Sequence, residues 1–498
     1  MDLLAPLWKW LRASPSAKVV VCTALAAVYY ALLLSEPRFG NPLISRPDGG
    51  INLTFNSMLE HMLRGEFDVD PAIIGVEGFT HDGHTYAYWG IVPAFLRMPL
   101  LMFDGGLALS VTGLSCLLAI AFAVFMKLQT LRKVCEAFPQ NRPVQFAGMI
   151  LAATLLLSGA QIAFLRANVY TEVCLWAACF GSIIVYGAVT GLISWKFTTG
   201  LLTMMAIAAG LGLNTRVSAG IGFYCAMGLL LLALWLGRGD HGEREDVLPL
   251  RARMLARLAA PRLFVPAAVL LAFAFVTGFV NYERWGNPLT FLDLRYYELI
   301  DEFPERLVRA QQSGLFNPER IPFGLIYYFF PIWAFFRADG RLFLEEHQLR
   351  ILDVTELPPS SFLVTDLLLL LLLGYGLVRL AFSHANTGLD RARAISVGTG
   401  LMMACLLMLT AISMNYRYRL DFYPFLEYGA FLGLFTMGRA AEGSTTIRVL
   451  SLAMVATALI SMAGSHVSLL LLKVSPYGPG IPYLHDRVYQ PLFDRLWH

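Results

Sequence analysis

Long apolar runs with almost no charged residues recur along the whole chain. A membrane-spanning helix needs roughly 20 mostly apolar residues, and about eleven segments of this sequence fit that window. We predict spans at residues 18–35, 106–126, 144–165, 172–194, 198–214, 217–236, 263–281, 362–380, 396–414, 422–438 and 447–470. The first run starts late and no clear cleavage site follows it, so we expect a span rather than a signal peptide. The fold class expected is an all-α polytopic membrane protein, forming a single membrane domain over residues 1–498.

The composition agrees with a membrane environment. Hydrophobic residues make up 57% of the chain and charged residues 15%, whereas a soluble domain carries about 25% charged residues. This balance excludes an ordinary cytosolic enzyme, a disordered protein and a secreted disulfide scaffold. The net charge is only +3, so no nucleic-acid partner is suggested. The seven cysteines have no metal-site spacing.

Lysine and arginine residues in the loops predict the orientation of the spans. With the N-terminus inside, the inner segments hold nineteen basic and eight acidic residues, a net charge of +11, and the rest of the chain carries −8. Charges at membrane depth are costly and usually functional. Four arginines lie at predicted outer helix ends, where either function or snorkelling to lipid headgroups would account for each of them: Arg166, Arg216, Arg417 and Arg419.

Two predicted outer loops are long, at residues 36–105 and 282–361. Long loops inside a compact membrane protein are usually functional. In the second loop the apolar run IPFGLIYYFFPIWAFF is too short to span, so we expect a re-entrant or interfacial helix there. In the first loop, apolar residues with helical spacing predict an amphipathic helix in the membrane interface: Leu53, Phe55, Met58, Leu59, Met62 and Leu63.

Acidic residues in the first loop are candidates for catalysis or metal binding. Asp48 lies in RPDGG, where a carboxylate near arginines can act as a general base, and a solvated turn aspartate is the equal alternative. Asp68 and Asp70 form a D-x-D pair of the oxygen ligands that divalent ions prefer, although a solvated acidic turn is the simpler interpretation. His81 and His84 also fit a turn, and the sequence names no further ligands for a metal site.

Arginines at the outer helix ends indicate a phosphate ligand. Guanidinium groups bind phosphate oxygens in a bidentate manner and keep their charge. Arg216 lies in GLNTRVS, Arg284 in NYERWGNP and Arg417 in NYRYRLDFYP. For Arg417, a structural ion pair with Asp421 at i, i+4 is the alternative. An anionic lipid phosphate at the outer membrane face is the ligand expected.

In their order along the chain, these segments resemble the GT-C superfamily of integral membrane glycosyltransferases. They are similar to bacterial relatives of the protein O-mannosyltransferases and of the aminoarabinose transferases that modify lipid A. The resemblance runs from about residue 46 to 426 and rests on RPDGGINLTFNSMLEHMLRGEFDVD, GHTYAYWGIVPAFLRMPLL, NVYTEVCLWA, GLNTRVS, NYERWGNPL and NYRYRLDFYPFL.

The resemblance implies that a sugar moves from a polyprenyl-phosphate carrier to a glycan, lipid or protein acceptor, on the periplasmic face of a bacterial inner membrane. It implies Asp48 as the carboxylate that activates the acceptor hydroxyl. It also implies arginines that stabilise the departing lipid phosphate: Arg216 and Arg417 first, then Arg284 and Arg166. Several family members carry two adjacent acidic residues where Asp48 is followed by glycines, so three other acids stay open as alternatives: Glu60, Asp68 and Asp70. Family members differ in metal dependence, so a divalent ion such as Mg²⁺ or Mn²⁺ also stays open.

Two other functions remain open. A polysaccharide polymerase or ligase with a polyprenyl-diphosphate carrier would also have a long outer loop rich in arginine. A transporter or flippase of lipid-linked sugars would bind anionic lipids too, but it should show inverted repeats and ionisable residues deep in its spans. The predicted spans are nearly free of mid-membrane charge, which favours a one-sided enzyme.

Overall fold

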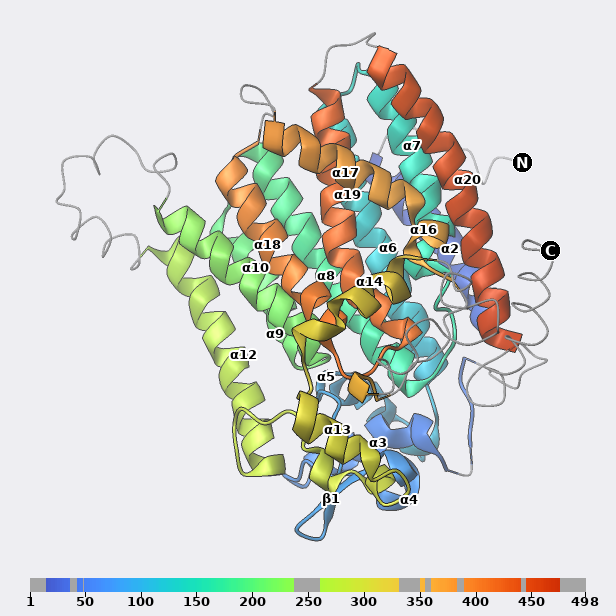
Figure 1. Ribbon diagram of the computed structural model, residues 1–498, viewed down its shortest axis with the longest axis vertical. Coiled ribbons are helices and arrows are strands. Elements are labelled where there is room, and N and C mark those ends of the chain that lie inside the picture. Colours follow the sequence, from blue (N-terminus) through green and yellow to red (C-terminus); the bar gives the residue numbers. More distant parts are fainter. Residues whose placement is uncertain are drawn as a thin grey trace, which may run out of the picture.

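The computed structural model describes residues 15–35, 43–47, 49–236, 260–330, 350–353, 360–382, 389–439 and 445–474. Long helices run side by side through most of the molecule, and most of the short elements of the two long loops gather at one end of them, at the bottom of Figure 1. We call this end the loop end and the opposite one the far end.

Each of the eleven predicted spans corresponds to a helix or a broken helix in the described part of the chain. These are α2 (Pro15–Leu34), α6 (Thr112–Glu136), α7 (Arg142–Leu157), α8 (Val169–Ser194), α9 (Thr199–Leu213), α10 (Val217–Leu236), α12 (Pro261–Trp285), α16 and α17 (Phe362–Thr365 and Leu367–Phe382), α18 (Arg391–Thr410), α19 (Tyr423–Gly438) and α20 (Thr445–Val474). Among them, eight are long and apolar enough to cross a membrane, while α9, α17 and α19 are shorter. The all-helical membrane fold predicted from the sequence is confirmed.

Helix starts and helix pairs follow from local chemistry. Side chains of polar residues accept hydrogen bonds from backbone N–H groups in the first turns of four helices, which satisfies donors that have no partner inside the helix: Asn141, Asn168, Thr198 and Asp390. Apolar faces then pair α10 with α18, α17 with α19, α6 with α8 and α12 with α9. Because α9 packs on α12 and α10 packs on α18, the turn between α9 and α10 is held in place at the loop end.

The first long loop folds into short elements at the loop end. These are η3 (Ile51–Leu53), α3 (Thr54–Met62), α4 (Pro71–Ile74), η4 (Gly75–Glu77), β1 (Phe79–His81), β2 (His84–Tyr86), α5 (Val92–Phe95), η5 (Met98–Met102) and η6 (Gly106–Ala108). The amphipathic helix predicted here is α3, but Phe55, Met58 and Leu59 are buried in the same core as the spanning helices. The apolar face of α3 therefore contacts the protein core, and its location in the membrane interface stays a prediction.

The second long loop packs on the first. Its described elements are η9 (Leu294–Tyr296), η10 (Glu298–Ile300), α13 (Glu305–Ser313), η11 (Pro318–Arg320) and α14 (Ile321–Phe329). The rings of Phe79 and Tyr297 stack with centroids 4.6 Å apart, and the backbone N–H of Glu298 donates to the Gly78 carbonyl at 3.1 Å. The predicted apolar helix is α14, and the end of its run, 331–336, lies outside the described residues. The two loops therefore form one covering layer.

Lys127 lies inside α6 rather than beyond its end. The predicted span stopped at residue 126 because of this charge, but the helix continues to Glu136. The Lys127 ammonium lies 2.6 Å from the carboxylate of Glu427 in α19, and both side chains are 2% exposed. Charges within spans are tolerated when they face protein and pair with one another. This ion pair therefore joins α6 to α19 inside the protein.

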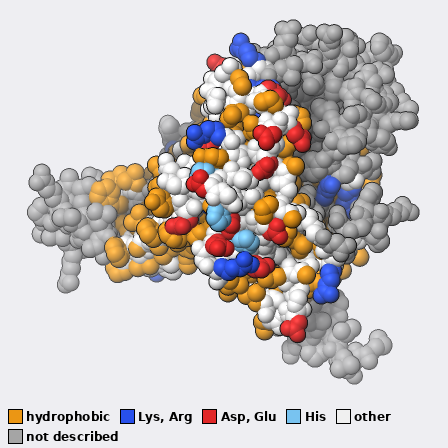
Figure 2. Space-filling view, turned by 90° about the horizontal axis from the view of Figure 1, so that it is seen from below, with side chains coloured by type: hydrophobic (Ala, Val, Ile, Leu, Met, Phe, Trp, Pro, Cys, Tyr) orange, Lys and Arg blue, Asp and Glu red, His pale blue; other side chains and the backbone are white. Residues whose placement is uncertain are grey.

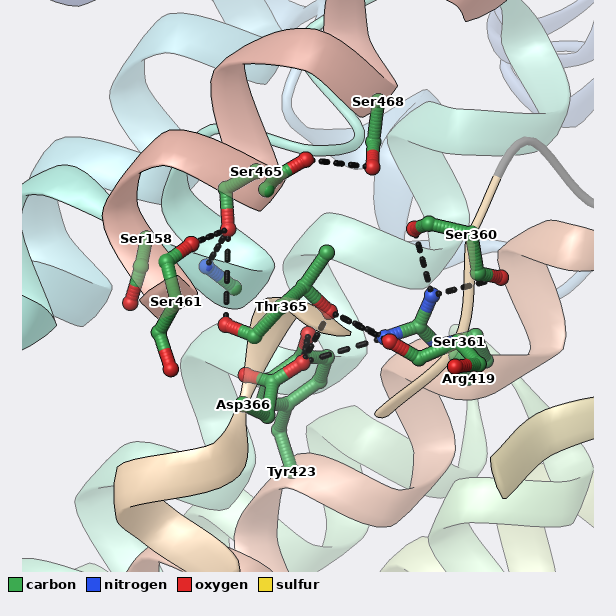
Figure 3. A network of polar contacts seen from close by, with 12 residues as sticks. Ser158, Ser360, Ser361, Thr365, Asp366, Arg419, Tyr423, Ser461, Ser465 and Ser468 are labelled. Carbon is green, nitrogen blue, oxygen red and sulfur yellow. Dashed lines mark hydrogen bonds and ion pairs between the residues drawn. The ribbon is translucent and has the colours of Figure 1, made fainter. Parts of the chain in front are cut away.

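A second buried charge pair lies where the predicted span 362–380 breaks. Asp366 separates α16 from α17, and one of its oxygens accepts hydrogen bonds from Arg419 at 3.0 Å and from Tyr423 at 2.8 Å. Thr365 and serines of α20 surround this pair (Figure 3). The Arg419 side chain is completely buried. Arg419 therefore connects helices inside the protein, unlike the predicted arginines that face the loop end.

Candidate active site

Arg216 lies in the turn between α9 and α10, at the loop end. Its Nε donates to both carboxylate oxygens of Asp421, at 2.8 and 3.1 Å, and Ser218 donates to the same carboxylate at 2.7 Å. The guanidinium carbon lies 4.9 Å from the centroid of the Tyr418 ring. Asp421, considered from the sequence as a local partner of Arg417, is thus bound by Arg216, which is 205 positions away.

Arg417 stands on η13 (Tyr416–Phe422), the short helix that precedes α19. Its guanidinium carbon lies 4.7 Å from the ring centroid of Tyr170 in α8 and 5.5 Å from that of Tyr418. A guanidinium group stacks on aromatic faces and carries its N–H donors in its own plane. Arg216 and Arg417 therefore both contact the ring of Tyr418, which brings two cations to the same part of the loop end.

The first loop is held directly on the turn that carries Arg216. The backbone N–H of Gly90 donates to the Thr215 carbonyl at 3.3 Å, and that of Val92 donates to the Asn214 carbonyl at 3.0 Å. A Cβ atom at position 90 would stand 2.0 Å from the Asn214 carbonyl oxygen, so only glycine permits this approach. Trp89 then packs edge-on against Tyr170, with ring centroids 5.4 Å apart. The loop thus covers the arginines.

The structure adds one carboxylate, that of Glu77, to the arginines of the candidate site. It lies at the end of η4 and accepts a hydrogen bond from the Tyr297 hydroxyl at 3.1 Å. Burial raises the pKa of the nearby Tyr88 hydroxyl. The charge of Glu77 also raises this pKa, whereas the charge of Arg417 lowers it. Glu77 was not predicted from the sequence, because it stands in GVEG, where only the flanking glycines indicate a turn. Glu77 and the two arginines therefore act electrostatically on the same hydroxyl, that of Tyr88.

The acids predicted from the sequence differ in their surroundings where the structure describes them. Asp48 falls outside the described residues. Glu60 is exposed and pairs with Arg64 at 2.5 Å, and Asp70 caps α4 by accepting a hydrogen bond from the Ala72 N–H at 2.8 Å. Asp68 is nearly buried and accepts hydrogen bonds from two histidines, His61 and His84.

The other predicted arginines differ in their surroundings. Arg284, at the end of α12, is buried and donates to the backbone carbonyls of Trp89 at 2.9 Å and Phe67 at 3.3 Å. These bonds tie the first loop to α12, so any phosphate at Arg284 would have to compete with them. Arg166 is half-buried between η7 (Gly159–Gln161) and α8. Only Arg216 and Arg417 are brought together on Tyr418 by the contacts described above.

Among the described residues, one group combines three side chains able to ligate a metal ion: His61, Glu66 and Asp68, whose ligand atoms all lie within 4.8 Å of one another. Although burial opposes ionisation of Asp68, hydrogen bonds from His84 and His61 lower its pKa below the usual value. Figure 2, which views the molecule from the loop end, shows histidine and acidic side chains gathered in the middle of that face.

Comparisons with known proteins find similarity among solved structures. No model of a protein family matches the sequence, and no curated protein matches it either. Among solved structures, the chain is similar to the oligosaccharyltransferase AglB of Archaeoglobus fulgidus in complex with an inhibitory peptide and a dolichol-phosphate, with 13% identity, a TM-score of 0.46, and coverage of 98% of this chain and 60% of AglB. It is also similar to ArnT of Cupriavidus metallidurans bound to undecaprenyl phosphate, with 14% identity, a TM-score of 0.30, and coverage of 93% of this chain and 80% of ArnT.

The chain spans about 60% of the length of AglB. Because the TM-scores lie below 0.5 and the identities are 13% and 14%, the function of this chain is inferred from its own residues.

Proposed function

We propose that this chain is a glycosyltransferase that moves a sugar from a polyprenyl-phosphate carrier to an acceptor hydroxyl of a glycan, lipid or protein. The observation that carries the proposal is the pair of arginines, Arg216 and Arg417, that both contact the ring of Tyr418 at the loop end. Two cations at a helix end are a natural binding site for a lipid phosphate, because guanidinium groups hold phosphate oxygens in a bidentate manner.

In the proposed reaction, polyprenyl phosphate is the leaving group. A carboxylate takes the proton from the acceptor hydroxyl, the oxygen bonds to the anomeric carbon, and the bond from that carbon to the phosphate oxygen breaks. The negative charge that the phosphate gains is stabilised by Arg417 and Arg216. Asp48 is the proposed base, on the resemblance of its segment to the GT-C family. Glu77 is proposed to orient the acceptor, because it lies on the same covering loop near the arginines.

The proposed location follows from the charge asymmetry of the loops. The segments that hold the candidate site belong to the part of the sequence with a net charge of −8, and the other side carries +11. The positive side of a membrane protein faces the cytoplasm. We therefore propose that residues 36–105 and 282–361 form periplasmic loops at a bacterial inner membrane, and that the reaction takes place there.

The first test is native mass spectrometry of the purified protein in detergent after addition of a synthetic polyprenyl phosphate. Wild type should retain the lipid, and Arg417→Ala should weaken retention about 10- to 100-fold, since a hydrogen bond to a charged group contributes about 1.5–3 kcal/mol. Arg132→Ala removes a half-buried arginine at the far end, where it pairs with Glu136, and should bind like wild type. Absence of lipid from wild type, or equal retention by all three proteins, would reject the proposal.

A transporter of lipid-linked sugars is the second candidate, because the helices contain the buried pairs Lys127–Glu427 and Asp366–Arg419. An assay in detergent solution distinguishes transfer from transport, because no membrane divides two compartments there. Formation of a glycosylated product from a polyprenyl-phosphate sugar in detergent would support the transferase. A protein that binds the carrier but forms product only with a diphosphate-linked donor would instead be the polymerase or ligase considered from the sequence.

A further inference from the structure

The chain reverses direction immediately after α3 and returns two acids to the side of a histidine. His61 lies in the last turn of α3. Gly65 has a φ of +88°, a left-handed conformation that glycine adopts without strain, and the backbone N–H of Glu66 then donates to the His61 carbonyl at 3.1 Å. The short sequence HMLRGEFD thereby brings His61, Glu66 and Asp68 to one place at the surface of the loop end.

The ligand atoms of these residues have the spacing of a metal site. His61 Nδ1 lies 2.7 Å from Asp68 Oδ1 and 3.8 Å from Glu66 Oε2. In a tetrahedral site with bonds of about 2.0–2.1 Å, neighbouring ligand atoms are about 3.3 Å apart. The two observed distances lie on either side of that value, so small side-chain movements would bring the three atoms around one ion.

A histidine from a different segment completes the arrangement. His84 comes from β2, and its Nδ1 donates to Asp68 Oδ2 at 2.7 Å. The backbone bond from Val69 N–H to the Thr85 carbonyl, at 2.8 Å, aligns the two segments. Asp68 is 8% exposed, whereas the Glu66 and His84 side chains are about half exposed. Asp68 is therefore held inside the protein, and the half-exposed Glu66 and His84 side chains leave the site open to an ion from solution.

We propose that His61 Nδ1, Glu66 Oε2 and Asp68 Oδ1 bind one zinc ion, with a fourth position open and with His84 orienting Asp68 through its second oxygen. One imidazole and two carboxylates form a mixed nitrogen and oxygen set, which suits zinc better than magnesium. Hydrogen-bonded partners of metal ligands orient them and tune affinity. The ion would fasten α3 to the β1–β2 hairpin. This inference does not depend on the proposed glycosyl transfer, because binding is measured without turnover.

The test is zinc binding by tag-free, chelator-washed protein in detergent, followed with a competing chromophoric chelator and by elemental analysis. Wild type should bind one equivalent, and zinc should raise its melting temperature because the ion binds the folded state. Glu66→Gln changes an exposed residue and should preserve the fold while it weakens zinc affinity at least tenfold. His84→Ala should weaken it about 10- to 100-fold as a partner of a ligand.

The matched control is His81→Ala. His81 belongs to the same hairpin but packs on Tyr296 and pairs with Asp82, so its replacement should leave zinc affinity unchanged. Three outcomes would overturn the proposal: no stoichiometric zinc on wild type, equal affinity in wild type and Glu66→Gln, or displacement of zinc by equimolar magnesium.

Discussion

Arg97 and Glu172 form a buried bidentate ion pair between the first loop and α8. The Arg97 Nη1 and Nη2 atoms donate to the two carboxylate oxygens at 2.5 and 2.8 Å, and Ser115 donates to the same carboxylate. Because α8 also carries Tyr170 on its first turn, this pair fixes the loop relative to the ring on which Arg417 stacks. The arginine that positions the candidate site is therefore distinct from the arginines proposed to bind phosphate.

Replacement of Arg97 by alanine should strongly destabilise the protein. Removal of one partner leaves a buried, uncompensated charge, which costs about 3–5 kcal/mol. Arg64→Ala removes an exposed arginine that pairs with Glu60 and should cost about 0–1 kcal/mol. Thermal unfolding in one detergent would measure both, and equal melting temperatures for the two variants would contradict a structural role of the Arg97–Glu172 pair.

Asp48→Asn should lose turnover while it still retains the lipid donor. General-base catalysis contributes about 10²–10⁴-fold, and the substitution leaves Arg216 and Arg417 unchanged. Glu77→Gln should mainly raise KM for the acceptor, with a smaller effect on kcat. Glu60→Gln, an exposed acid on α3, is the control and should behave like wild type. If Glu77→Gln abolished turnover and Asp48→Asn did not, the base would be Glu77.

Gly90→Ala should impair both stability and activity. Its Cβ would stand 2.0 Å from the Asn214 carbonyl oxygen, so the loop would have to move off the turn that carries Arg216, at a cost of about 1–3 kcal/mol for overpacking. Gly200→Ala meets no atom within 4 Å in the first turn of α9 and should be neutral or stabilising. A Gly90→Ala protein with normal melting temperature and normal lipid retention would show that the close approach is unimportant.

The helical membrane architecture was predictable because it follows from hydropathy, which each segment carries by itself. Contacts between residues distant in sequence were not predictable in this way. The partner of Lys127 is Glu427, 300 positions further on, and Arg419, which the sequence places among arginines at outer helix ends, pairs with Asp366. The packing of α3 in the same core as the spanning helices likewise depends on the whole fold.

The residues of the candidate site also fall into those that the sequence predicts and those that it does not. Arg216 and Arg417 were identified because charge at a helix end is conspicuous in an apolar sequence. The structure adds that both contact the ring of Tyr418. Glu77 carried no such signal, and His84 was interpreted as a turn residue because Asp68, its partner, lies 16 positions earlier on a different segment. Residue types were therefore predictable, whereas their convergence depended on the folding of the first loop.

Substitutions at Lys127 and Glu427 should distinguish the two leading functions. Lys127→Met alone leaves the buried Glu427 carboxylate without its cation and should cost about 3–5 kcal/mol. The double variant Lys127→Met, Glu427→Leu removes both charges and should recover most of that stability, because an apolar pair of similar volume often replaces a buried ion pair without loss. If the pair is structural, the double variant should also keep glycosyl transfer near the wild-type rate. A transporter that needs these ionisable groups within its helices would instead lose function in the double variant although its melting temperature was restored.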